Sequence, residues 1–144
     1  MSRLPDWIAR LDVFLALSDS RPFEWGANDC ALFACSAIDA MTGRDPGEHF
    51  RARYKTARGA KERLRQFCGK ASLERTAEMI CEEEGFEEVA PAFAQRGDLV
   101  AIDQPPFDAA LGVVDLNGRE CVFAGPHGAT RLPLAGARRA WRIA

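Results

Sequence analysis

Histidine, paired cysteines and long apolar runs are scarce or absent in this sequence. The 144 residues include only two His, His49 and His127, and no Cys-x-x-Cys pair. We therefore expect no zinc site, no other metal and no cofactor. No apolar run reaches the roughly 18 residues that a transmembrane helix needs. Asp12 interrupts the one early apolar stretch, so the sequence predicts no signal peptide, a cytoplasmic place of synthesis and no membrane contact.

The composition is that of one folded domain, which we expect to span residues 1–144. The chain is 47% hydrophobic and 28% charged, enough apolar mass for a single core. The net charge of −2 argues against nucleic acid as a partner bound through overall charge. An odd number of cysteines without a secretory signal indicates reduced thiols. The five are Cys30, Cys35, Cys68, Cys81 and Cys121.

The first half of the chain predicts helices. Apolar residues recur at helical spacing between Leu4 and Leu15, which predicts an amphipathic helix over residues 4–17. Residues 30–41 are apolar at nearly every position, which is typical of a buried helix. Asp29 is placed to cap its start, and Thr42-Gly43 to end it. Residues 46–84 suggest short helices, with breaks expected at Gly59, Gly69 and Gly85.

Charge is segregated within that helical part. Residues 51–70 hold eight Lys or Arg against one Glu, and residues 74–88 hold seven Glu against one Arg. One interpretation is that two solvated helical faces pair with each other. The alternative is a docking surface for an anionic partner.

The second half predicts strands at 97–102, 110–116, 119–124, 129–134 and 138–143. Asn117-Gly118, between the second and third of these, is a strong hairpin signal because both residues tolerate positive φ. Helices followed by an antiparallel sheet indicate an α+β fold, with the buried helix packed on the sheet.

Cys30 is the residue with the clearest chemical potential. It follows an aromatic loop that contains Phe23 and Trp25, and it opens the predicted buried helix. Free N–H groups and the helix dipole at such a position favour an anion, which lowers a thiol pKa and can hold an oxyanion. The alternative is a small buried hydrophobe, the common role of cysteine.

Several short motifs occur in an order shared with a known enzyme superfamily. They are Trp25-Gly26-x-Asn28-Asp29-Cys30, Arg96-Gly97-Asp98-Leu99-Val100 and Leu111-Gly112-Val113-Val114. In this order the sequence resembles the NlpC-type cell-wall cysteine peptidases, which are papain-like enzymes that cut the peptide stems of peptidoglycan. The segment from Phe50 to Leu64 and the ending Arg139-Ala140-Trp141-Arg142 resemble an uncharacterised phage and prophage branch of that superfamily, often encoded near tail genes.

The sequence departs from the family pattern at two positions. The family's catalytic His begins the strand that here starts with Ala110, and alanine cannot act as a base. The family's aromatic loop carries a Tyr two residues before the Trp, where this chain has Phe23. A cysteine nucleophile needs a base within hydrogen-bond reach.

The predicted hairpin offers a substitute for the missing base. With a two-residue Asn117-Gly118 turn, the residue numbers of any two opposed residues in the hairpin add up to 235. His127 then lies opposite Asp108, one pair beyond Ala110 on the same face of the sheet. In that register Asp108 would orient His127, as in other catalytic triads. Pro126 lacks a ladder N–H, however, and residues 125–128 also suit a turn that leaves His127 on the surface.

The resemblance implies a phage or prophage cysteine peptidase that hydrolyses amide bonds of peptidoglycan. Its catalytic residues would be Cys30, His127 and Asp108, with substrate contacts from Trp25, Phe23 and Asp29. Its partners would be peptidoglycan peptides or phage tail proteins. The alternative is a catalytically degenerate papain-like module that acts in tail assembly or another protein interaction. A thiol-dependent hydrolase or transferase with another substrate is a third possibility. Activity and oligomeric state stay open.

Overall fold

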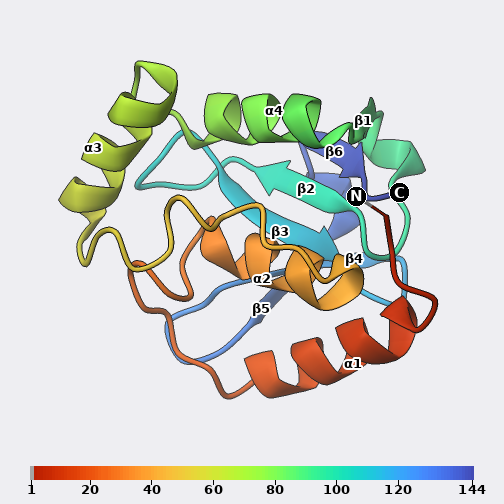
Figure 1. The fold of residues 1–144 in the computed structure, drawn as a ribbon. Helices are drawn as coiled ribbons and strands as arrows, with labels where there is room; N and C mark the ends of the chain where they lie inside the picture. The colour runs from red at the N-terminus through yellow and green to blue at the C-terminus, as the bar shows by residue number, and fades with distance from the viewer. Residues whose placement is uncertain (1) are drawn as a thin grey trace.

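A computed structural model describes residues 2–144 as four helices and a six-stranded sheet (Figure 1). The helices are α1 (Trp7–Ser18), α2 (Leu32–Thr42), α3 (Ala57–Cys68) and α4 (Leu73–Glu84). The strands are β1 (Glu87–Val89), β2 (Leu99–Ile102), β3 (Ala110–Val114), β4 (Glu120–Phe123), β5 (Thr130–Pro133) and β6 (Arg139–Arg142). Two short 3₁₀ turns, η1 (Pro91–Phe93) and η2 (Leu134–Gly136), complete the order.

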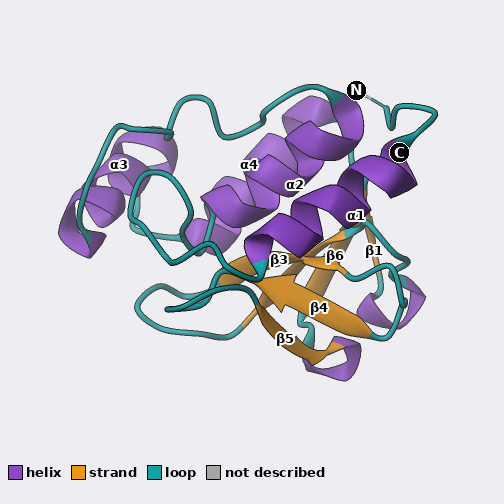
Figure 2. Cartoon of the chain, turned by 90° about the horizontal axis from the view of Figure 1, so that it is seen from below, coloured by secondary structure: helices purple, strands orange, loops and turns teal. Residues whose placement is uncertain are grey.

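The sheet has the order β1-β6-β2-β3-β4-β5, and each neighbouring pair is antiparallel. The α+β prediction is therefore confirmed. Figure 2 shows the long helices above the strands, with α3 at the edge of the molecule. In the part of the chain that the structure describes, no helix is long and apolar enough to cross a membrane.

Helix ends follow the glycines for the most part. Gly43, Gly69 and Gly85 stand just past α2, α3 and α4 with φ of 80°, 86° and 77°, a conformation that glycine adopts without penalty. The prediction of a helix break at Gly59 was wrong. Gly59 lies in the first turn of α3, and its N–H donates to the hydroxyl of Thr56, which caps the helix.

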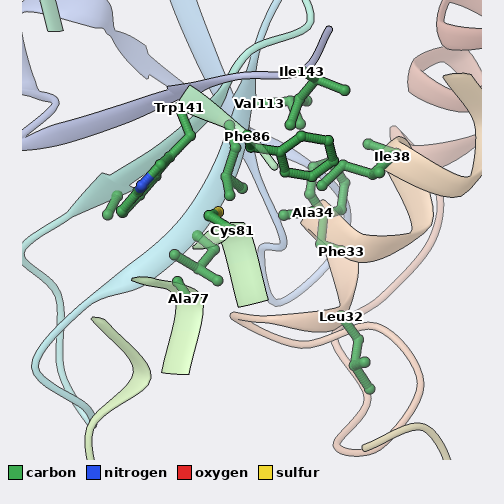
Figure 3. Packing of buried hydrophobic residues seen from close by; sticks show 14 of the residues in the cluster. Leu32, Phe33, Ala34, Ile38, Ala77, Cys81, Phe86, Val113, Trp141 and Ile143 are labelled. Atoms are coloured by element: carbon green, nitrogen blue, oxygen red, sulfur yellow. The ribbon is translucent and has the colours of Figure 1, made fainter. Parts of the chain in front are cut away.

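Two apolar clusters lie on opposite faces of the sheet. On one face, α2 and α4 pack against β2, β3, β4 and β6, and Figure 3 shows Phe33, Cys81, Val113 and Trp141 among the side chains of this cluster. This arrangement confirms the prediction of a buried helix packed on the sheet. The second cluster covers the other face and consists of Ala94, Val100, Ile102, Ala110, Val114, Cys121, Phe123 and Ala140.

The β3–β4 hairpin has the predicted register where the strands pair. Val113 lies opposite Val122 and Val114 opposite Cys121, as positions summing to 235 require. Beyond Val113 the ladder does not continue toward Ala110. Instead, the N–H of Leu111 donates to the carbonyl of Cys30, at 2.7 Å. The turn before α2 thus occupies the edge of β3 that β4 was expected to cover.

The two ends of the described chain meet at one buried carboxylate. Asp98, just before β2, has no exposed surface and accepts hydrogen bonds from the Arg3 guanidinium and the Ile143 N–H, at 3.0 and 3.3 Å. Arg96-Gly97-Asp98 is therefore a turn into a strand, as the sequence indicated, with Gly97 at a φ of 83°.

Candidate functional site

Asp29 organises the turn that carries Cys30. One carboxylate oxygen accepts from the N–H groups of Ala31 and Leu32, at 3.0 and 2.9 Å. The other accepts from the N–H of Gly26, at 3.0 Å. The Asp29 carbonyl also accepts from the N–H of Phe33, so Asp29 supplies acceptors to the start of α2 as predicted, although the N-cap position itself is Ala31.

Tyr54 is a member of the site that the sequence did not reveal. Its hydroxyl donates to the second oxygen of Asp29, at 2.6 Å. Burial of the phenol and the adjacent Asp29 charge both raise the pKa of Tyr54, so it stays protonated and remains a donor. Tyr54 lies 25 residues from Asp29, and nothing in the local pattern of either segment signals the contact.

Arg51 fixes the same loop from outside. Its guanidinium donates to the carboxylate of Asp45, the carbonyl of Ala27 and the hydroxyl of Ser36, at 2.8, 3.2 and 3.1 Å. These contacts join the aromatic loop to α2. The turn that holds Cys30 is therefore braced on both sides, by Asp29–Tyr54 and by Arg51.

The Cys30 thiol is not in the environment that a helix start was expected to provide. Burial and the adjacent Asp29 charge raise its pKa well above the usual range, whereas the sequence predicted a lowered pKa. The N–H groups of Ala31 and Leu32, which would stabilise a thiolate or an oxyanion, are already bonded to the Asp29 carboxylate. The cap therefore neutralises the helix terminus and adds a like charge beside the sulfur.

Cys30 borders a small apolar cavity between α2, α3, α4 and β3. The cavity measures about 40 Å³, and among its walls are Tyr54, Leu64, Phe107 and Leu111. A space of this size accommodates a few atoms, while drug-sized ligands occupy roughly 300–1,000 Å³. It is a packing void beside the thiol and too small for a peptide substrate.

Three aromatic rings form a row that leads to this cavity. Trp25 packs edge-on against Phe23 at a centroid distance of 4.8 Å and against Phe107 at 6.0 Å. All three side chains are half-buried. Of the three rings, Phe107 lines the cavity that Cys30 borders, whereas Trp25 and Phe23 lie farther along the row and are not among the cavity walls. Asp29, by contrast, is fully buried and bonded to internal donors, which leaves it no surface for a substrate.

The structure does not bring His127 to Asp108. His127 is exposed in the turn between β4 and β5, and this turn is anchored on the end of α1 by the bond from the Ala129 N–H to the Ser18 carbonyl, at 2.9 Å. The expected pairing of these two residues was wrong because β4 parts from β3 after Val122, where the Cys30 carbonyl takes the next strand position.

Asp108 has a different set of partners. Its carboxylate accepts from the Ser72 hydroxyl and from the N–H groups of Leu73 and Glu74, the last two at 2.8 and 3.3 Å. It therefore supplies acceptors for the start of α4. Burial alone would raise the pKa of Asp108, but these hydrogen bonds outweigh it and lower the pKa.

The Asp29 carboxylate beside Cys30 is occupied by internal donors, and the two clusters that pack against Cys30 are apolar, so neither supplies it with a base. The thiol packs against both apolar clusters, and the cluster on the far face of the sheet includes Ala110 and Phe123. Ala110 begins β3 and is 3% exposed. Among residues 2–144, no hydrogen bond joins the Cys30 sulfur to a histidine, and no group of three or more His, Cys, Asp or Glu could hold a metal ion.

A family model described as a domain of unknown function, DUF6950, matches residues 2–143. No curated protein matches the chain.

Proposed function

The chain belongs to the DUF6950 family, a domain of unknown function, and we propose that it is a papain-like module of the NlpC type that has lost hydrolytic activity and acts by binding other proteins. The observation that carries the proposal is the state of Cys30. The thiol stands at the helix start where the resemblance places a nucleophile, yet burial and the adjacent Asp29 charge raise its pKa, and Cys30 packs against two apolar clusters. The resemblance to phage proteins suggests a tail assembly as the setting.

The arrangement of elements supports the papain-like part of the proposal. The turn with Cys30 leads into a buried helix on an antiparallel sheet, and its carbonyl contacts the second residue of β3. Position 110 is therefore the natural place for a base that serves Cys30. Alanine at this position removes the proton acceptor that a cysteine nucleophile requires.

Restoring a base is the experiment that tests this proposal. The variants Ala110→His and Ala110→Asn add side chains of similar bulk at the same buried position, and only the first adds a base. We expect wild type and Ala110→Asn to leave peptidoglycan sacculi intact, and Ala110→His to alkylate faster at Cys30 near neutral pH. Overpacking costs about 1–3 kcal/mol at such a site, so circular dichroism must show that both variants fold.

An active wild-type protein would overturn the proposal. If the native chain releases peptides from sacculi and Cys30→Ala abolishes the release, the domain is a cysteine peptidase. Comparing His127→Ala in the same assay then determines whether the exposed histidine reaches Cys30 during turnover.

A further inference from the structure

A strongly basic surface is formed by α3 and the loop that precedes it. Residues 51–70 carry a formal charge of +7, against −9 for the rest of the chain. We call the following five side chains the basic face: Arg53, Lys55, Arg58, Lys61 and Arg65. All are exposed except Lys61, which is half-exposed. Figures 1 and 2 both show α3 at the periphery, away from the sheet.

The acid-rich helix α4 does not neutralise the basic face. Its glutamates pair elsewhere: Glu74 with Arg138, Glu78 with Arg139, and Glu84 with Arg44. No ion pair within residues 2–144 joins the segment 74–88 to the segment 51–70. The interpretation that these two charged segments pair with each other was therefore wrong.

Most of the basic face has no acidic partner inside the molecule. Arg65 has an ion pair with Glu62, at 3.4 Å, between two side chains that are more than half exposed. A pair of this kind contributes little in water. Of the residues that the structure describes, none forms an ion pair with Arg53, Lys55, Arg58 or Lys61. The positive charges of the basic face therefore stay available to an external partner.

The spacing on α3 concentrates this charge. Arg58, Lys61 and Arg65 are three and four residues apart, so they share one side of the helix, while Ala60 and Leu64 are buried on another. Like charges at these spacings disfavour a helix. The fold thus maintains an arrangement that is locally unfavourable unless an anion covers it.

We propose that the basic face docks an acidic segment of a partner protein. The face is short, because the 12 residues of α3 extend roughly 18 Å. A long polyanion such as DNA would run beyond it onto a body that carries the opposite charge balance. An anionic membrane would lack apolar anchors, since the large exposed hydrophobic side chains are Ile8, Val13, Leu17 and Phe93, all outside residues 51–70.

The proposal shares with the proposed function only the premise that the domain binds proteins. It does not depend on the state of Cys30. Binding at the basic face and reactivity at Cys30 are read by separate assays, so one proposal can fail while the other stands.

Fluorescence anisotropy with a labelled 12-residue oligoglutamate peptide tests the basic face. The full chain is titrated at low and at high salt, beside the triple variant Arg58→Glu, Lys61→Glu, Arg65→Glu. The matched control, Arg21→Glu, Arg96→Glu, Arg119→Glu, changes the net charge equally at other exposed positions. We expect about tenfold weaker binding in the first variant, a change below about threefold in the control, and loss of binding at high salt.

Several results would overturn the proposal. Absence of peptide binding at low salt would do so, as would equal losses in the two folded variants. A 12-base-pair duplex DNA or phosphatidylserine vesicles that bind more tightly than the peptide would assign the face to a different class of partner.

Discussion

Replacing Asp29 with alanine removes one carboxylate from four internal donors. The N–H groups of Gly26 and Leu32 form buried bonds to it, while the bonds from Ala31 and Tyr54 are partly buried. A buried donor left without an acceptor costs about 1–3 kcal/mol. Two of the four donors are fully buried and the other two can bond to water instead, so we expect the free energy of unfolding to fall by about 3–5 kcal/mol. That is a large share of the roughly 5–15 kcal/mol that stabilises a domain.

Urea unfolding followed by tryptophan fluorescence measures this loss. The midpoint should fall with little change in the dependence of unfolding free energy on urea, because the same surface is exposed. Tyr54→Phe removes one of the four donors and should cost about 1 kcal/mol. Asp12→Ala, at an exposed position, is the control and should stay within about 0.5 kcal/mol of wild type. A loss below about 1 kcal/mol for Asp29→Ala would refute the anchoring role.

Two further predictions concern stability. Asp108→Ala should cost about 1–2 kcal/mol at neutral pH because it removes acceptors from the start of α4. Since the folded pKa of Asp108 lies below its ordinary 3.8, this contribution is present above pH 3.8 and disappears as the pH falls through the folded value. Urea unfolding at pH 7 and pH 3 measures the difference, and an equal cost at both would contradict it. Gly112→Ala should destabilise the chain by more than about 2 kcal/mol, because an added Cβ would lie 2.3 Å from the carbonyl oxygen of Val122. Gly118→Ala meets open space and should cost only about 1 kcal/mol for its positive φ, so thermal melts that rank the two alike would reject the packing argument.

Short sequence patterns predicted the elements that are determined by interactions between residues close together in the chain. The apolar run at 30–41 and the glycine after it located α2 within two residues, and the Asn117-Gly118 signal set the correct hairpin register. The exception is β1. Glu87 and Glu88 are exposed on an edge strand that follows an acidic helix, so the segment lacks the alternation that marks a half-buried strand.

The candidate site depended on contacts that no short pattern encodes. Asp108 was expected beside His127, but its acceptors serve α4, which begins 35 residues earlier in the chain. The β3–β4 ladder ends early because the Cys30 carbonyl accepts the hydrogen bond from the N–H of Leu111. Tyr54 and Arg51 brace the Cys30 turn across long sequence separations. Tertiary competition for hydrogen bonds therefore accounts for the errors at the site.

The pH dependence of alkylation at Cys30 tests most directly whether this cysteine is an unactivated thiol. Iodoacetamide labelling is read peptide by peptide, with the other four cysteines as internal controls. A thiol pKa above the roughly 8.5 of free cysteine leaves less than about 3% thiolate at pH 7, so Cys30 should react more slowly than a free thiol and accelerate only in alkali. Labelling at Cys30 that stays fast well below pH 8.5, and that His127→Ala slows, would contradict this conclusion and identify an activated nucleophile.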